Sequence, residues 1–149
     1  MINVVIADDH RMFLEGLTAL LKGETRINIL GTALNGREAI ELVRNHDVDL
    51  MIMDVSMPEV DGIELNNMLK KSFPNVKTLV LTSHSDHQIV SRLTRKSING
   101  YLLKNAEKEE LLEAIYKIDS GENYYSQMVK DKVLESLFYT NNEQEVPEL

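Results

Sequence analysis

The sequence predicts an α/β domain in which a parallel sheet is covered by helices on both faces. Five short apolar runs alternate with stretches whose apolar residues recur at helical spacing. The apolar runs are continuous rather than alternating, which is typical of strands buried on both faces. Regular alternation of strand and helix implies parallel strands joined by right-handed crossovers.

Five strands are expected from the apolar runs. The first run, in MINVVIADDH, is rich in β-branched side chains, which suit a buried strand. No run reaches the roughly 20 apolar residues that cross a bilayer, so no membrane span is expected. The predicted strands are Ile2–Ala7, Ile27–Thr32, Asp49–Met53, Val76–Leu81 and Asn99–Leu102.

Five amphipathic stretches between and after these runs predict the helices. The second helix is expected after Asn35, and the third near Asp61, which can cap it. The apolar positions that define each of the five helices include pairs three or four residues apart. They are Phe13, Leu17, Leu20 and Leu21; Ala39, Ile40 and Val43; Ile63, Leu65 and Leu69; Ile89, Val90 and Leu93; and Leu111, Ala114, Ile115 and Ile118.

The pattern changes after Gly121, where strand and helix no longer alternate. One more amphipathic stripe predicts a sixth helix, which either packs back on the domain or serves as a linker or dimer-forming helix. The final residues, TNNEQEVPEL, have no apolar period and indicate an exposed linker. The stripe consists of Val129, Val133, Leu134, Leu137 and Phe138.

Composition restricts the class of protein. The 149 residues carry a formal net charge of −8, and a surface this acidic does not by itself bind nucleic acid. The absence of cysteine excludes disulfides and thiolate metal sites and is typical of a cytoplasmic protein. No basic region precedes the first apolar run, so a signal peptide is not expected.

Polar side chains follow four of the five predicted strands. In an open parallel sheet, ligands bind beyond the carboxyl ends of the strands, so these side chains are expected to meet at one edge. Each alone has a simpler explanation, such as a turn aspartate, a helix cap or a solvated lysine. Their occurrence together favours a site made of Asp8, Asp9, Asp54, Thr82, Ser83, His84 and Lys104.

Three carboxylates at one edge require neutralisation. Two such charges about 4 Å apart repel by roughly 4 kcal/mol at an effective dielectric near 20. Protonation or a cation can relieve this repulsion, and Lys104 supplies one positive charge. A divalent cation can supply the rest, and oxygen-only ligands favour Mg²⁺ or Mn²⁺ over zinc.

The motifs IADDH, DVSMPEVDG, TSH and GYLLK occur in a recognisable order and spacing. With them, residues 2 to about 120 resemble the receiver domain of a bacterial two-component response regulator. GYLLK and the later IYKIDSGENYYS are most similar to the NarL/FixJ (LuxR-type) class. The resemblance implies a flavodoxin-like, CheY-like fold: a doubly wound five-stranded parallel sheet of order 2-1-3-4-5, plus a C-terminal linker helix.

The resemblance also implies a phosphorylation site. Asp54 would accept a phosphoryl group from a sensor histidine kinase or a small phosphodonor. Asp9 would bind Mg²⁺ directly and Asp8 through water, with Asp54 and the backbone carbonyl of Ser56 as further ligands, and Mn²⁺ as a possible substitute. Such a chain is not an enzyme in the usual sense, although it would catalyse its own phosphorylation and dephosphorylation. No other cofactor is implied.

Further residues match the family's activation machinery. Thr82 and Lys104 would contact phosphoryl oxygens, and Thr82 and Tyr101 would form the switch, with Tyr101 turning inward on activation. The other interpretation of Tyr101 is a half-buried strand residue with its hydroxyl in water. Pro58 and Gly62 are expected to shape the loop after the third strand, proline by fixing φ and glycine by permitting unusual conformations.

The resemblance assigns residues 2–121 to the receiver domain and 122–149 to a linker helix and tail. LuxR-type regulators join the receiver to a C-terminal helix-turn-helix domain by such a segment, and Ser126–Tyr139 with EVPEL resembles it. No recognition helix or basic patch is present in the sequence, so the chain is expected to be the receiver portion of a transcriptional regulator. It would not bind DNA alone and would dimerise on phosphorylation.

The nearest alternative shares the predicted site and differs only in its output. A stand-alone receiver would act by protein–protein interaction or in a phosphorelay. A Mg²⁺-dependent phosphatase with an aspartate nucleophile would place that nucleophile in a D-x-D arrangement after the first strand, where this chain has adjacent aspartates. An inactive pseudo-receiver is disfavoured because every acceptor, metal and lysine position is filled.

Overall fold

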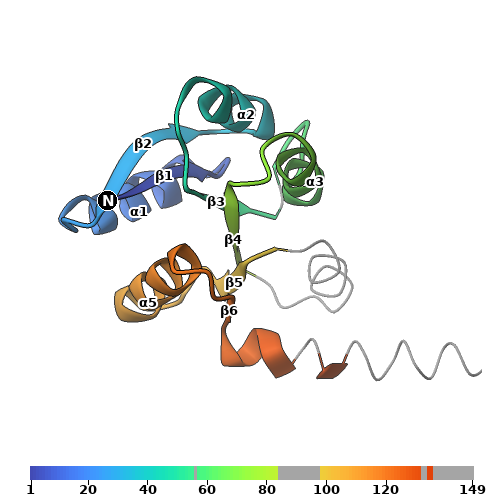
Figure 1. Ribbon diagram of the computed structural model, residues 1–149. Helices are drawn as coiled ribbons and strands as arrows, with labels where there is room; N and C mark the ends of the chain where they lie inside the picture. The colour runs from blue at the N-terminus through green and yellow to red at the C-terminus, as the bar shows by residue number, and fades with distance from the viewer. Residues whose placement is uncertain (56, 84–97, 132–133, 136–149) are drawn as a thin grey trace, which may run out of the picture.

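A parallel sheet lies at the centre of the computed structural model, with helices on both faces (Figure 1). The structure describes residues 1–55, 57–83, 98–131 and 134–135. The fourth predicted helix, with Ile89, Val90 and Leu93, lies outside these residues. The strands are β1 Ile2–Ala7, β2 Ile27–Ala33, β3 Leu50–Asp54, β4 Lys77–Thr82, β5 Gly100–Leu103 and β6 Tyr124–Tyr125. The helices are α1 Arg11–Lys22, α2 Gly36–Asn45, α3 Gly62–Ser72 and α5 Lys108–Asp119.

The order of strands is β2-β1-β3-β4-β5-β6. This confirms the predicted parallel sheet and its 2-1-3-4-5 order. The expected five strands are joined by a sixth, because Tyr124 pairs with Gly100 and Tyr125 with Tyr101 at the edge of β5. β6 was not predicted, since two residues are too few to form an apolar run.

The predicted ends of two central strands were one residue short. Asp54 pairs with Leu81 in the ladder between β3 and β4, and Thr82 pairs with Leu103 in the ladder between β4 and β5. The apolar pattern stops at Met53 and Leu81 because it reports only which side chains are apolar, whereas the ladder depends on hydrogen bonds between backbone groups. The polar residues that end the strands are therefore held by the sheet itself.

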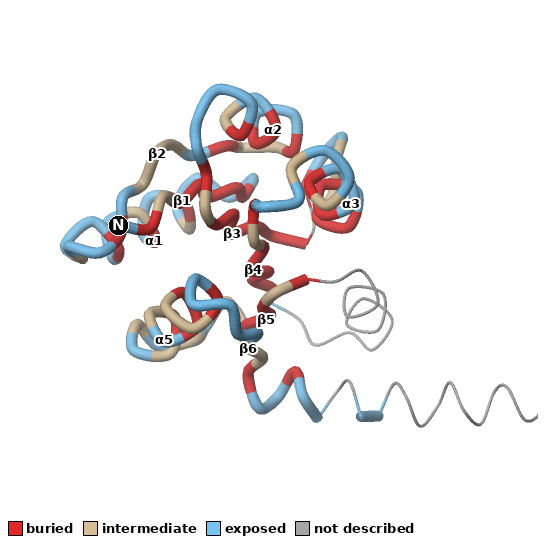
Figure 2. The backbone as a smooth tube through the Cα atoms, in the orientation of Figure 1, coloured by how far each residue is buried: buried red, intermediate tan, exposed pale blue. Residues whose placement is uncertain are grey.

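Two apolar layers form because alternate side chains of each strand point to opposite faces of the sheet. Val5 and Ala7 pack with residues of α2 and α3, such as Val43. Val4 and Ile6 pack with residues of α1 and α5. Figure 2 shows the strands and the inner sides of these helices as mainly buried, with exposed residues on the outer turns and loops.

Local side-chain caps begin two helices where the sequence predicted them. The Asn35 side chain accepts a hydrogen bond from the Glu38 backbone N–H at 2.9 Å and begins α2. Asp61 accepts one from the Glu64 N–H at 2.9 Å and begins α3. Each cap satisfies a backbone donor that the helix leaves unpaired. Of the predicted apolar positions, Leu20 on α1 is exposed rather than buried.

The chain continues to pack on the sheet after α5. Gly121 has φ +102° and follows the C-cap of α5, a conformation that glycine adopts without a steric penalty. The Tyr124 hydroxyl donates to Glu110 at 3.0 Å, and burial with this carboxylate raises the pKa of Tyr124 to about 12. Residues 127–131 are helical, and Val129 is fully buried in the core.

This packing bears on the predicted sixth helix. Its first turn packs back on the domain through Val129, while Met128 and Leu134 are exposed. Val133, Leu137 and Phe138 lie outside the described residues. Contact with the sheet therefore extends beyond the predicted boundary at residue 121.

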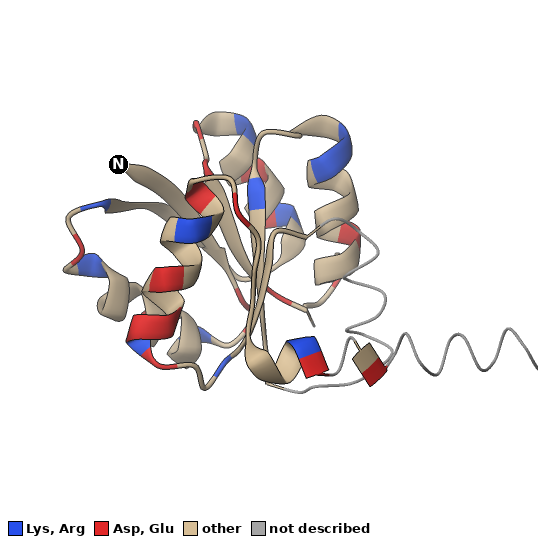
Figure 3. Cartoon of the chain, turned by 60° about the horizontal axis from the view of Figure 1, so that its bottom comes forward, with Lys and Arg blue, Asp and Glu red and all other residues tan. Residues whose placement is uncertain are grey.

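Charged side chains lie mainly on helices and loops, with acidic and basic residues interspersed (Figure 3). The central strands carry few charges, apart from those at their ends. Within the described part of the chain, no helix combines the length and apolar character that a bilayer crossing requires.

Candidate functional site

Side chains from three strand ends meet at the carboxyl edge of the sheet. Asp8 follows β1, Asp54 ends β3 and Lys104 follows β5. The Lys104 Nζ lies 2.7 Å from Asp8 Oδ2 and 3.5 Å from Asp54 Oδ2. The ammonium group thus connects carboxylates from two strands, as the predicted convergence at this edge required.

Both carboxylates are withdrawn from solvent, with Asp8 2% and Asp54 6% exposed. Buried charges are tolerated only when they are paired and hydrogen-bonded. Lys104 is itself fixed from two other directions. Its backbone N–H donates to the Thr82 carbonyl at 2.7 Å, and its Nζ lies 4.5 Å from the centre of the Phe13 ring. The ammonium group therefore occupies a defined position.

Asp9 and His10 complete the group on its more exposed side. The His10 Nδ1 lies 3.1 Å from Asp8 Oδ1 and 3.1 Å from Asp9 Oδ1. Asp8, Asp9, His10 and Asp54 each offer one ligand atom, and these four atoms lie within 4.8 Å of one another. We refer to these four residues as the carboxylate cluster. His10 was not among the residues predicted for the site, although IADDH places it directly after the aspartates.

The carboxylate cluster has the donor set of a hard divalent cation. Asp8, Asp9 and Asp54 contribute three carboxylates, and Lys104 contributes one ammonium, which leaves two negative charges when all four are ionised. A divalent cation would balance them, and carboxylate oxygen is the ligand that Mg²⁺ and Mn²⁺ prefer. The cluster can therefore hold a metal ion.

Thr82 is buried at the end of β4, one position beyond the residue that pairs with Asp54. The adjacent Ser83 is exposed. Ser56 and His84, which the sequence also proposed near the site, lie outside the described residues. Thr82 is thus the hydroxyl residue that the sheet holds at the same edge as Asp54 and Lys104.

Tyr101 is fully buried on β5. It belongs to the apolar layer that includes Val80, Ile98 and Val129. The half-buried orientation, with the hydroxyl in water, is therefore wrong for this structure. This layer thus joins residues of β4, the segment before β5 and the C-terminal helical turn.

The loop between β3 and α3 departs from the expected use of glycine. A Cβ on Gly62 would lie 2.6 Å from the Asp54 carbonyl oxygen, so glycine is needed there for a close approach. The positive φ in this loop belongs to Glu59, at 68°, whose neighbours are joined by a Val60 N–H to Pro58 carbonyl hydrogen bond of 2.8 Å. Gly62 thus supports the backbone of Asp54 from behind.

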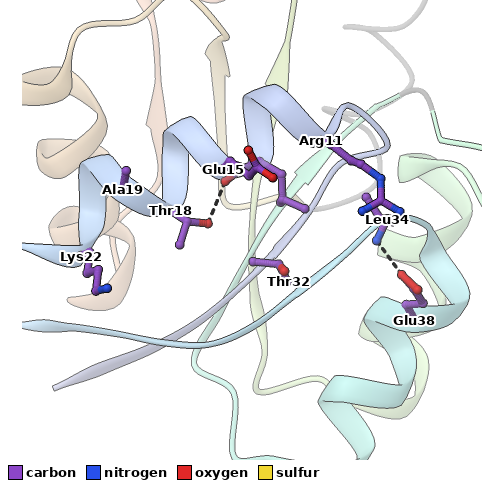
Figure 4. Close-up of a pocket in the computed structure, with 9 residues that line it drawn as sticks. Arg11, Glu15, Thr18, Ala19, Lys22, Thr32, Leu34 and Glu38 are labelled. Atoms are coloured by element: carbon purple, nitrogen blue, oxygen red, sulfur yellow. Dashed lines mark hydrogen bonds between the residues drawn. The ribbon is translucent and has the colours of Figure 1, made fainter.

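One pocket lies away from this edge. It has a volume of about 490 Å³ and lies between α1, β2 and the start of α2 (Figure 4). Near it, the Thr18 hydroxyl donates to the Leu14 carbonyl, and the Leu34 N–H donates to Glu38. Its lining mixes Arg11 and Lys22 with Glu15 and Glu38 and includes no residue of the carboxylate cluster.

Curated relatives cover nearly the whole chain. It is 33% identical over 144 residues to the transcriptional regulatory protein DegU of Brevibacillus brevis, an alignment that spans 97% of this chain and 61% of DegU. It is 37% identical over 123 residues to the oxygen regulatory protein NreC of Staphylococcus haemolyticus, across 82% of this chain and 57% of NreC. The chain thus spans little more than half the length of these relatives.

A solved structure supports the same relationship. The isolated receiver domain of RcsB from Salmonella enterica serovar Typhimurium, determined with the phosphomimetic BeF₃⁻, matches with a TM-score of 0.82 and 29% identity. The match covers 89% of this chain and 98% of that one. Residues 4–116 match the family described as the response regulator receiver domain. The chain therefore belongs to the response regulator receiver domain family.

Proposed function

We propose that the carboxylate cluster is a phosphorylation site at which Asp54 accepts a phosphoryl group from a sensor histidine kinase. The supporting observation is the position of Lys104, whose Nζ lies between Asp8 and Asp54 at 2.7 and 3.5 Å. Phosphoryl transfer depends mainly on positioning and on compensation of the charge on the phosphoryl oxygens. An ammonium beside the acceptor carboxylate provides such compensation.

A divalent cation, Mg²⁺ or in its place Mn²⁺, is part of this proposal. Asp8, Asp9 and Asp54 would hold it, together with the backbone carbonyl of Ser56, which lies outside the described residues. The cation would offset negative charge on the transferred group. Lys104 and the Thr82 hydroxyl would bind phosphoryl oxygens, so that the chain catalyses its own phosphorylation and dephosphorylation.

Thr82 and Tyr101 form the proposed switch. Thr82 would move toward the new phosphoryl group, and Tyr101 would fill the space behind it. The burial of Tyr101 beside Ile98 and Val129 supports a route from the site to the C-terminal helical turn. Phosphorylation can bias such an element because it adds charge and hydrogen-bond acceptors at one point.

The proposed output is transcriptional control in the cytoplasm, through a LuxR-type DNA-binding domain that these 149 residues do not include. DegU is a transcriptional regulatory protein, and RcsB is known as dimers bound to DNA. Residues 2–121 would be the receiver domain, and 122–149 would lead toward that domain. The phosphorylated chain would form homodimers, which analytical ultracentrifugation with and without beryllofluoride tests. A chain that responds but stays monomeric would favour the stand-alone receiver.

The acceptor assignment is tested by acetyl phosphate and by beryllofluoride, each with Mg²⁺. Intact mass measurement should show one added phosphoryl group on the wild-type chain, and beryllofluoride should shift backbone amide NMR signals at the carboxyl edge of the sheet. Asp54→Asn should lose both responses. Asp47→Asn, at an exposed aspartate, should retain them. An unchanged response in Asp54→Asn would refute the assignment.

A further inference from the structure

His10 occupies the N-cap of α1 without acting as a cap. Ser, Thr, Asp and Asn are preferred at this position because their short side chains accept a hydrogen bond from the first turn of the helix. The His10 side chain makes no such bond. The ring is turned instead toward Asp8 and Asp9, in a local departure from helix-capping preference of the kind that functional sites show.

Two distances from the His10 ring match the spacing of neighbouring ligands in a coordination sphere. Neighbouring ligands of an octahedral ion with bonds of about 2.1 Å lie about 3 Å apart. The His10 Nδ1 lies 3.1 Å from both Asp8 Oδ1 and Asp9 Oδ1. One cation could therefore be bound by this nitrogen and these two oxygens without a large movement of the side chains.

Asp8 divides its two oxygens between different partners. Oδ2 faces Lys104 at 2.7 Å, while Oδ1 accepts the His10 backbone N–H at 2.8 Å and faces the His10 ring. Lys104 therefore neutralises the inner side of Asp8 and leaves Oδ1 for the outer side. The His10 side chain is 68% exposed, so a cation and its waters can reach this side directly from solvent.

We infer that His10 is a further ligand of the cation in the carboxylate cluster, through Nδ1, and that it strengthens binding of Co²⁺, Ni²⁺ and Zn²⁺ relative to Mg²⁺. Imidazole nitrogen suits these transition metals, whereas Mg²⁺ prefers oxygen and keeps several waters. The inference rests on the proposed function, in which the cluster binds a divalent cation. It adds a residue that determines which cation is bound.

Two measurements test the ligand role of His10 in the full 149-residue chain. With Co²⁺, a coordinated imidazole should give a hyperfine-shifted, exchangeable ring N–H signal in proton NMR. Calorimetric titration should give the affinities for Ni²⁺ and Mg²⁺. His10→Ala removes the ring without removing a helix cap, and circular dichroism checks that α1 remains folded. His46→Ala is the control, since His46 is exposed and contacts the Leu42 carbonyl. His84→Ala tests the other histidine that the sequence placed near the site.

His10→Ala should lose the shifted signal and bind Ni²⁺ at least about tenfold more weakly. Even the loss of a residue that only hydrogen-bonds a metal ligand lowers metal affinity by about 10- to 100-fold. Its Mg²⁺ affinity should change by about twofold or less. His46→Ala should behave as wild type. A signal that persists in His10→Ala or disappears in His84→Ala would overturn the inference. An equal change in the affinities for Ni²⁺ and Mg²⁺, in either direction, would also overturn it, because the ring would then act only through its charge.

The proposed function is judged separately, by the beryllofluoride response of the wild-type chain with Mg²⁺. If that response is present and the cobalt signal is absent, the His10 inference alone fails. If the wild-type chain binds no divalent cation, both fail.

Discussion

Two lysines at opposite ends of the sheet have contrasting surroundings. Lys104, at the carboxyl end, faces the carboxylates of Asp8 and Asp54. Lys70, at the amino end, donates to the amide oxygen of Asn99 at 3.0 Å. Burial lowers the pKa of Lys70 because the charged form is less well solvated. One lysine is held by opposite charge, and the other by the dipole of an amide group.

The groups around the two lysines differ in the same way. At the amino end, Asn99 also accepts the Thr78 backbone N–H at 2.9 Å, and the Thr78 hydroxyl donates to the buried Asn66 at 3.0 Å. These neutral groups satisfy one another. At the carboxyl end, the carboxylates outnumber the ammonium. A buried network with satisfied hydrogen bonds stabilises the fold, whereas one with excess charge is suited to bind a further ion.

Removal of the ammonium should have the largest effect. Lys104→Met leaves two buried carboxylates without their partner and should lower the free energy of unfolding by about 3 kcal/mol, as measured by urea denaturation without metal. Added Mg²⁺ should restore part of this loss, because a cation replaces the missing positive charge. Lys108→Met is the matched control, since Lys108 makes a partly exposed ion pair with Glu24 and should contribute less than about 1 kcal/mol. Equal losses in both variants would contradict the contrast.

A methyl group behind Asp54 should have the next largest effect. In Gly62→Ala the new Cβ would lie 2.6 Å from the Asp54 carbonyl oxygen, which should destabilise the domain by about 2 kcal/mol and weaken the beryllofluoride response. Gly16→Ala, on α1, meets nothing within 4 Å and should stabilise by up to about 1 kcal/mol through helix propensity. Thermal and urea denaturation of both variants measure the difference. A neutral Gly62→Ala would show that this loop yields easily.

Substitutions in the neutral network should lower the stability of the domain without changing its phosphorylation. Asn66→Ala leaves the Thr78 hydroxyl without this acceptor and should cost about 1–2 kcal/mol in urea denaturation. The double variant Asn66→Leu, Thr78→Val removes both polar groups and should recover much of the loss. Acetyl phosphate should modify each variant as it does the wild type. A loss of phosphorylation would mean that the two ends of the sheet are coupled.

The smallest expected effect is the pH dependence due to Lys70. Its pKa is lower in the folded state than the ordinary lysine value of 10.5, so the unfolded chain binds more protons between the two values. The free-energy cost of burying the charged lysine is complete below the folded pKa and disappears as pH rises toward 10.5. Stability should therefore rise with pH in that window. Lys70→Met should lack this rise relative to wild type in urea denaturation from about pH 7 to about pH 10, whereas Lys22→Met should keep it. A parallel pH profile for Lys70→Met and wild type would contradict the origin assigned to it.

The sequence alone predicted that strands and helices alternate along the chain and that Asp8, Asp54, Thr82 and Lys104 lie at one edge of the sheet. Continuous apolar runs identify strands buried on both faces, and parallel strands bring the residues after each run to one edge. These inferences need only the chemical type of each residue and its place along the chain. The caps at Asn35 and Asp61 were equally local.

Tertiary structure alone decided the pairing of β6, the burial of Tyr101, the close approach behind Asp54 and the turn of His10 toward two carboxylates. The sequence could not reveal them because each depends on distances of a few ångströms between atoms, which the types and order of the residues do not specify. Gly62 illustrates this most clearly. Its sequence context indicated an unusual backbone angle, but the neighbouring strand required it to be small, because packing leaves no room for a Cβ.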